Sequence, residues 1–162
     1  MSEIHIMPFQ QKDTAEIVNL FYDTVREVNR ADYSEEAIAA WAPEEGKENV
    51  LNEWRSSLLE NQTFVARMKD QIAGFADIRA EGYVDRLYVH KDKQRMGIAS
   101  DLLMEIEKWA RKEDIPLIWT FSSITAKDFF ERFGFELIGE ENAERKGILL
   151  TRFKMKKMLI EE

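Results

Sequence analysis

Apolar residues recur at two different spacings along this chain, and the two spacings predict different elements. Recurrence every three or four residues, which buries one helix face, predicts helices over 13–28, 34–41, 48–59 and 98–110, and a last helix ending at 133–134. Short alternating or continuous apolar runs between turn residues predict strands over 4–9, 63–68, 72–80, 83–89, 117–121, 135–139 and 148–155. The order of these elements predicts an α/β fold with a mixed central β-sheet and helices on both faces.

Polar residues mark the starts of three predicted helices. Asp13 precedes the first apolar helix face, and Ser34 precedes a short helix with two glutamates in its first turn. Ser123 or Thr125 precedes the last helix. Because these side chains can accept a hydrogen bond from a free N–H of the first turn, we expect each to cap its helix.

The most informative stretch runs from a strand through a charged loop into the long helix. The loop reads Gln94-x-x-Gly97-x-Ala99, and small residues there allow an anion to approach the backbone closely. The first N–H groups of a helix point at such an anion, and the helix dipole favours its charge. The spacing therefore predicts a diphosphate site. The alternative is that Gly97 only relieves a tight strand-to-helix turn.

Two segments of the chain resemble the GNAT superfamily of N-acetyltransferases. Gln94, Gly97 and Ala99 fit the fixed positions of its coenzyme-binding segment, Gln/Arg-x-x-Gly-x-Gly/Ala, and 126–135 resembles its last helix and the Gly-Phe that follows. The motifs cover the second half of the chain, and the first half matches only in the order of its elements. The resemblance implies one domain over residues 1–162.

The resemblance also implies acetyl-CoA as co-substrate. Its diphosphate would lie at the loop, and its pantetheine arm would lie in a gap between strands 87–89 and 117–121, which splay apart in the family. The residues expected to contact the coenzyme are Leu87, Tyr88, Val89, Gln94, Arg95, Met96, Gly97, Ile98, Ala99, Ser100, Ser123 and Phe130.

Two of these positions depart from the family's pattern. Phe130 stands where many members carry a tyrosine that protonates the leaving thiolate, and Ser123 stands near the place of an asparagine that contacts pantetheine. Phenylalanine has no hydroxyl to donate. Water or another tyrosine would have to act, and Tyr83 and Tyr88 lie on the strand before the loop. The alternative for both tyrosines is ordinary packing on the sheet.

Asp85 is the best candidate for the base that takes the amine proton. It lies in the middle of a strand, among Tyr83, Val84, Leu87 and Val89, where aspartate is disfavoured, so it should face a cleft or pair with a cation. Catalysis and a purely structural ion pair are equally compatible with this position. Asp77, on the neighbouring strand, has the same ambiguity with less weight for function.

The resemblance implies that the segment from Tyr33 to Pro43 covers the acceptor, because helices after the first strand do so in the family. Its aromatic side chains, Tyr33 and Trp41, could form a wall of the substrate site that suits an amine, and Asp85 would face the same site. The alternative, favoured for Trp41, is that it packs the short helix onto the sheet.

Composition narrows the classes of function. The chain has 162 residues, 44% of them hydrophobic and 33% charged, with a net charge of −8 and no cysteine. The charge argues against nucleic-acid binding, no apolar run is long enough for a membrane, and the lack of cysteine excludes an acetyl-cysteine intermediate. We expect a cytoplasmic monomer or homodimer without a metal, because His5 and His90 have no partners at ligand spacing.

Three functions remain at this stage. The leading one is transfer of an acetyl group from acetyl-CoA to a primary amine of a small molecule or peptide, by direct attack in a ternary complex. The second is a non-catalytic acyl-CoA-binding or regulatory protein with the GNAT fold, favoured by Phe130. The third is a toxin–antitoxin or other partner-binding module with this fold.

Overall fold

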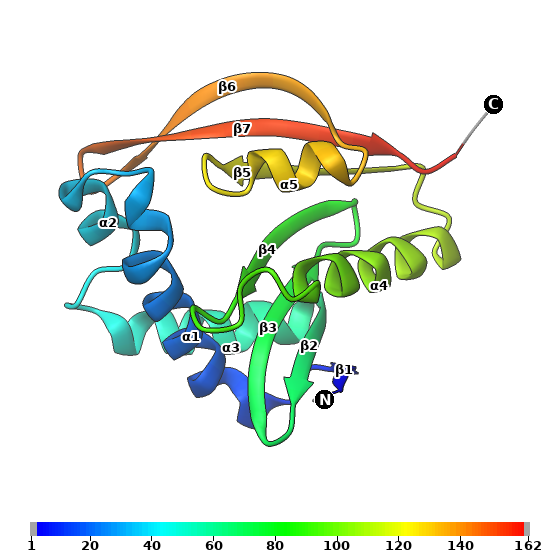
Figure 1. Ribbon diagram of the computed structural model, residues 1–162, viewed down its shortest axis with the longest axis horizontal. Coiled ribbons are helices and arrows are strands. Elements are labelled where there is room, and N and C mark those ends of the chain that lie inside the picture. Colours follow the sequence, from blue (N-terminus) through cyan, green and yellow to red (C-terminus); the bar gives the residue numbers. More distant parts are fainter. Residues whose placement is uncertain (1–2, 161–162) are drawn as a thin grey trace.

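The computed structural model describes residues 3–160, which form one seven-stranded sheet with helices packed on it (Figure 1). The strands are β1 (Ile4–Pro8), β2 (Gln62–Met68), β3 (Gln71–Ile78), β4 (Tyr83–Val89), β5 (Leu117–Ser123), β6 (Glu136–Arg145) and β7 (Ile148–Met158). The α-helices are α1 (Thr14–Glu27), α2 (Glu35–Trp41), α3 (Lys47–Glu60), α4 (Ile98–Lys112) and α5 (Lys127–Arg132). Short 3₁₀ turns span Gln11–Asp13 and Asn29–Ala31.

The sheet is mixed, as the sequence predicts. The strand order is β1-β2-β3-β4-β5-β7-β6, and only β4 and β5 run parallel. Apolar residues of α1 and α3 pack with Val65 and Phe75 on one face, and those of α4 and α5 pack with Ala66 and Ala76 on the other. Helices on both faces are therefore confirmed, and the chain has two apolar layers separated by the sheet.

The parallel strands β4 and β5 separate after a short contact. They pair only at Tyr83 with Trp119 and at Val84 with Thr120, so the rest of β4 has no partner in β5. Strand β5 instead pairs along its whole length with β7. The gap that the family resemblance implies is present, and it leaves backbone N–H and C=O groups of β4 free to bind an extended ligand.

The C-terminal hairpin is longer than the sequence predicts. Strand β6 continues to Arg145 instead of stopping at Gly139, and β7 continues to Met158 instead of Met155. The turn uses left-handed backbone at Lys146 and Gly147. Because β6 is an edge strand with mostly exposed side chains, its charged residues show no alternation, and pairing with β7 defines it instead.

One of the three predicted helix caps is confirmed. Ser34 accepts a hydrogen bond from the Ala37 N–H at 3.1 Å. Asp13 precedes α1 but does not cap it, because its carboxylate binds the Gln10 N–H and pairs with Arg67. The expected cap of α5 is also wrong: Ala126 occupies the N-cap position, where no side chain caps the helix.

Candidate active site

The loop between β4 and α4 forms an open pocket of backbone at the start of a 15-residue helix. Gly97 is the N-cap of α4 with a left-handed backbone at φ 82°, and a Cβ placed on it would meet nothing within 4 Å. Arg95 also has a left-handed backbone, at φ 61°. The first N–H groups of α4 belong to Ile98, Ala99 and Ser100, since the first bond within the helix is from Asp101 to Gly97. This arrangement can hold an anion.

Other residues of the predicted coenzyme segment contribute in different ways. The Gln94 amide donates to the carbonyl oxygens of Val89 at 2.7 Å and His90 at 3.2 Å, so it closes the loop onto the end of β4. The Ile98 side chain is buried in the core, which leaves only its backbone for a ligand. Arg95 and Met96 are exposed at the rim.

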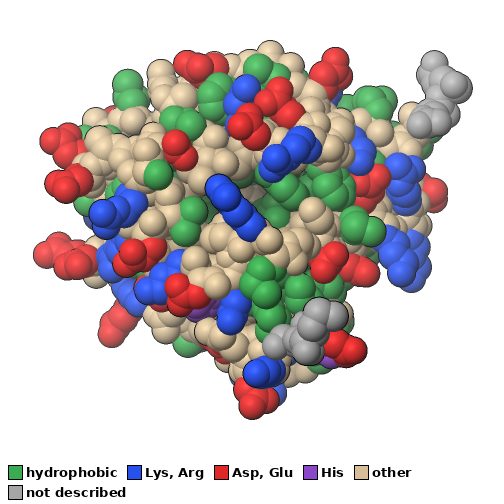
Figure 2. Space-filling view, in the orientation of Figure 1, with side chains coloured by type: hydrophobic (Ala, Val, Ile, Leu, Met, Phe, Trp, Pro, Cys, Tyr) green, Lys and Arg blue, Asp and Glu red, His purple; other side chains and the backbone are tan. Residues whose placement is uncertain are grey.

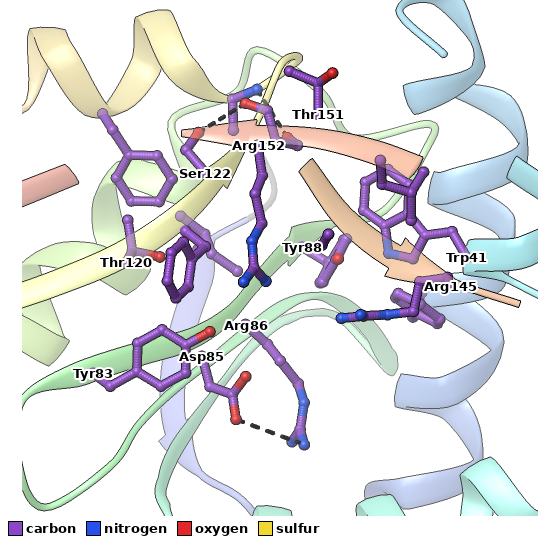
Figure 3. A pocket seen from close by; sticks show the side chains of 18 of the residues that line it. Trp41, Tyr83, Asp85, Arg86, Tyr88, Thr120, Ser122, Arg145, Thr151 and Arg152 are labelled. Atoms are coloured by element: carbon purple, nitrogen blue, oxygen red, sulfur yellow. Dashed lines mark hydrogen bonds and ion pairs between the residues drawn. The ribbon is translucent and has the colours of Figure 1, made fainter. Parts of the chain in front are cut away.

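A cavity of about 400 Å³ lies where β4 and β5 separate (Figure 3). Figure 3 shows β4 supplying Tyr83, Asp85, Arg86 and Tyr88, with β5, β7 and α2 completing the walls. The space-filling view shows hydrophobic side chains exposed between α5 and α4, with Lys or Arg side chains beside them (Figure 2). The lining residues are Phe21, Tyr33, Trp41, Val50, Trp54, Arg79, Tyr83, Asp85, Arg86, Leu87, Tyr88, Thr120, Phe121, Ser122, Ser123, Ala126, Phe130, Ala143, Arg145, Leu150, Thr151 and Arg152.

These features occur together in a known family. Residues 29–157 match the family model of the acetyltransferase (GNAT) domain. The chain belongs to the GNAT superfamily of acetyltransferases. It is 32% identical over 156 residues to YafP of Escherichia coli (strain K12), an uncharacterised N-acetyltransferase, and the match covers 96% of this chain and 97% of YafP.

Solved GNAT structures have the same fold. A GCN5-related N-acetyltransferase from Rhodopseudomonas palustris is 25% identical with a TM-score of 0.90, covering 98% of this chain and 97% of that one. The PaiA N-acetyltransferase of Thermoplasma acidophilum, solved in complex with coenzyme A, is 23% identical with a TM-score of 0.74, covering 96% of this chain and 99% of that one. The mixed α/β architecture is therefore that of a GNAT domain.

Asp85 faces the cavity of this GNAT domain and is also ion-paired. Its carboxylate accepts from Arg79 Nη2 at 3.1 Å and from Arg79 Nε at 3.3 Å, and Arg86 lies 4.0 Å away. The side chain keeps 17% exposure. Both arrangements that the sequence left open are thus present at one residue, because the carboxylate has a cation partner and a free approach from the cavity.

Asp77 lies deeper and has a structural environment. Its Oδ2 accepts from Arg86 Nη1 and Asn61 Nδ2, both at 2.9 Å, and the carboxylate is fully buried. Its Oδ1 has no hydrogen-bond partner among the described residues. Burial raises the pKa of Asp77 to about 6, although the Arg86 guanidinium opposes that rise. The pair fixes Arg86, which also donates to Ser57 Oγ at 2.7 Å.

The aromatic residues predicted for the acceptor region come together in the cavity wall. The rings of Tyr33 and Trp41 meet edge to face, with centroids 5.2 Å apart. The Tyr33 hydroxyl donates to the Thr151 carbonyl at 2.7 Å and accepts from the Ile124 N–H at 2.8 Å. The Tyr33 hydroxyl is therefore fixed by one hydrogen bond that it donates and one that it accepts, and the side chains of Tyr33 and Trp41 line the cavity.

The tyrosines of β4 keep their protons at neutral pH. Tyr83 stacks on Trp119 with centroids 4.4 Å apart, and burial raises its pKa. Tyr88 packs between Phe21 and Phe75, and burial raises its pKa as well. Each hydroxyl can donate a hydrogen bond, so the packing interpretation and a role as donor are both compatible with these positions.

Phe130 and Ser123 lie at the α5 side of the cavity. Phe130 is 3% exposed and packs edge to face against Phe129 and Phe135. The Ser123 Oγ accepts from the Ala126 N–H at 3.1 Å, which leaves its hydroxyl proton free to donate. The two departures from the family's pattern therefore leave an apolar ring and one hydroxyl beside the β4–β5 gap.

Several cavity residues were not predicted from the sequence, and three of them are arginines from outside β4. Arg79 follows β3, and Arg145 and Arg152 lie on the β6–β7 hairpin, far along the chain from β4. Nothing in their local sequence separates them from ordinary surface arginines. Only the strand order, which places β7 beside β5, brings the hairpin to the cavity.

Two further observations concern metal ligands and membrane-spanning helices. Within residues 3–160, no group of three or more His, Cys, Asp or Glu side chains is arranged to hold a metal ion. None of the helices that the structure describes is both long and apolar enough to cross a membrane.

Proposed function

We propose that this chain transfers an acetyl group from acetyl-CoA to a primary amine of a small molecule or peptide. The observation that carries the proposal is the separation of β4 from β5 beyond Val84, together with the open helix start at Gly97, to which the loop after β4 leads. An extended arm ending in a diphosphate fits this combination. The coenzyme complex of the related PaiA protein supports coenzyme A as the group bound.

Backbone groups of this chain would hold the coenzyme. The free N–H groups of Ile98, Ala99 and Ser100 would donate to the diphosphate, where the helix dipole favours negative charge. The side of the Leu87–Val89 backbone that has no partner in β5 would hydrogen-bond to the pantetheine amides, apart from the Val89 carbonyl, which already accepts from Gln94 and Thr24. The thioester would then lie at the cavity, close to Phe130 and Ser123.

The cavity residues suit direct attack on the thioester. A neutral amine nitrogen forms a bond to the carbonyl carbon, and the carbon–sulfur bond then breaks to give an amide and the coenzyme thiolate. Asp85 would accept the amine proton, directly or through a water, because it is the carboxylate in the cavity lining. The chain has no cysteine to form a covalent intermediate.

The departing thiolate needs a proton, and Phe130 cannot supply one. Water in the cavity would protonate the sulfur. The Ser123 hydroxyl, whose proton is free, would donate a hydrogen bond as the thiolate leaves. The stacked position of Tyr83 makes it the tyrosine that would assist from the β4 side. Thiolates are good leaving groups, so this assistance need not be strong.

A non-catalytic role is the second candidate, and two observations favour it. The usual acid position holds a buried phenylalanine, and Asp85 is bound by Arg79. A protein that holds acyl-CoA without turnover would need neither an acid nor a free base. It would keep the β4–β5 gap and the coenzyme cradle, meaning the Gly97 loop with the free N–H groups of Ile98, Ala99 and Ser100.

One experiment separates these candidates. Purified protein is incubated with acetyl-CoA and a panel of amines and peptides, and thiol release is measured beside mass spectrometry of the acceptor. We expect amine-dependent thiol release with an equal amount of acetylated amine. Tight coenzyme binding by calorimetry, without release on any amine, would establish the non-catalytic role instead.

A further inference from the structure

Arginine side chains dominate the charge of the cavity. Four arginines line it, Arg79, Arg86, Arg145 and Arg152, against one carboxylate, Asp85, among the described lining residues. The chain as a whole has a net charge of −8, so the cavity departs from the overall charge of the molecule. A local excess of the opposite sign in a partly enclosed site attracts ligands of complementary charge.

Ion pairs inside the protein neutralise only part of this excess. Arg86 pairs with Asp77, and Arg79 pairs with Asp85. The Nε and Nη2 atoms of Arg152 both contact one oxygen of Glu141, at 2.6 and 2.5 Å. Three carboxylates thus serve four guanidinium groups.

Arg145 is the cation left without a carboxylate. Its one hydrogen bond in the described residues is from Nη1 to the Glu144 carbonyl at 3.0 Å, and no acidic side chain there lies within 4.0 Å. Figure 3 shows its guanidinium directed into the cavity beside Trp41. Its remaining N–H groups are free to bind a ligand.

Arg152 is placed to share that ligand. Its guanidinium lies 3.8 Å from the centroid of the Phe121 ring, which fixes the plane of the group. Figure 3 shows it extending from β7 into the middle of the cavity. Only the Nε and one Nη are used by Glu141, so the other Nη can donate to an oxyanion from a second direction.

We infer that the amine acceptor carries an anionic group, a carboxylate or a phosphate, which Arg145 and Arg152 bind. The inference rests on the proposed acetyl transfer and specifies its substrate class. Arginine suits this role because its planar set of N–H donors matches the two oxygens of a carboxylate or phosphate. The amine of the same molecule would then face Asp85 and the thioester, on the β4 side of the cavity.

Matched pairs of acceptors test the inference. Phenylalanine is compared with 2-phenylethylamine, 4-aminobutyrate with butylamine, and O-phosphoethanolamine with ethanolamine, so that each pair differs in the anionic group. Phenylalanine amide controls for amine basicity. We expect kcat/KM to be at least tenfold higher for an anionic member, and the successful pair distinguishes carboxylate from phosphate.

A variant and its neighbour locate the effect. In Arg145→Gln, the ratio of kcat/KM for the anionic member to that for its uncharged partner should fall about tenfold or more, since a charged hydrogen bond is lost. Lys146→Gln removes the same charge one residue away, at a left-handed position outside this cavity, and should leave the ratio unchanged.

Binding measurements test the anionic acceptor independently of whether the protein acetylates any amine. Calorimetry of the same pairs with the coenzyme A complex should show the same preference and the same loss in Arg145→Gln, even if no amine is acetylated. If the protein binds the anionic members more tightly but acetylates no amine, the proposed reaction is contradicted and the anionic acceptor site is not. Equal binding and turnover of both members in every pair, or equal effects of the two variants, would overturn the anionic acceptor.

Discussion

Two aspartates on neighbouring strands show how burial separates the roles of identical residues. Asp77 and Asp85 both pair with arginines, and Arg86 lies between them, 2.9 Å from one and 4.0 Å from the other. Asp77 is fully buried, with one oxygen lacking any partner in the described chain, whereas Asp85 opens onto the cavity. Asp77 therefore holds the geometry of β3 and β4, and Asp85 is free to meet a substrate.

The role of Asp85 is testable by removing its charge. Asp85→Asn should lower kcat about tenfold to hundredfold and leave coenzyme affinity within about twofold, because the base is lost and the cradle is untouched. Asp70→Asn, at an exposed turn, is the control. Activity that merely follows the folded fraction, with a lower Tm, would make Asp85 structural.

The raised pKa of Asp77 predicts that the stability of the protein depends on pH. Its pKa is about 6 in the folded protein and 3.8 as a free side chain, so the folded state binds the proton more tightly. Between about pH 4 and 6, this residue's contribution to the free energy of unfolding must therefore fall as the pH rises. Urea titrations should show the wild type losing on the order of 1–3 kcal/mol relative to Asp77→Asn across this window. A constant difference would contradict the prediction.

At the scale of elements, two helices begin in the same way but in different surroundings. Gly97 before α4 and Gly46 before α3 are both left-handed N-caps, with φ of 82° and 85°. A Cβ at either would meet nothing within 4 Å. The helix start alone does not make a binding site, and what distinguishes Gly97 is the end of β4 and the gap beside it.

This pair of glycines gives a matched test of the cradle. Gly97→Asp should abolish coenzyme A binding in calorimetry, because a carboxylate would occupy the diphosphate site. Gly46→Asp introduces the same side chain, the same left-handed strain and the same helix N-cap, and should retain the wild-type affinity. If folded Gly97→Asp binds coenzyme A as tightly as Gly46→Asp and the wild type do, the cradle is not part of the coenzyme site.

At the scale of the whole molecule, Tyr33 connects segments that are far apart in the chain. Its hydroxyl joins the segment before α2 to β7 and to the connection between β5 and α5, across 118 and 91 residues. These contacts hold the segment before α2, which we propose covers the acceptor, against the C-terminal hairpin. Tyr22 is the opposite case, since its buried hydroxyl has no partner among the described residues.

The same substitution at the two tyrosines should have different effects. Tyr33→Phe should lower the free energy of unfolding by about 1–3 kcal/mol, because two hydrogen bonds are lost and two backbone groups lose a partner. Tyr22→Phe should be neutral or stabilising, because the oxygen it removes is unsatisfied. Urea unfolding of both variants measures the difference. An unchanged free energy of unfolding in Tyr33→Phe would mean that the two hydrogen bonds of Tyr33 contribute no net stability.

The sequence by itself determined the features that are local in the chain. The strand, loop and helix from β4 to α4 are contiguous, so residue types at Gln94, Gly97 and Ala99 report their own backbone geometry. The continuous burial of β3 and the alternating burial of β5 likewise follow from which side chains meet the core. The end of β6 was not predictable in this way, since pairing with β7 and not burial defines it.

Only the tertiary structure decided which distant residues share the cavity. Arg79, Arg145 and Arg152 have no common pattern in sequence, and the order β5-β7-β6 alone carries the hairpin arginines to β4. The ion pairs of Asp77 and Asp85 were left open by the sequence for the same reason. A charge's effect depends on its distance to other charges and on its burial, and both are set by the folded arrangement of strands.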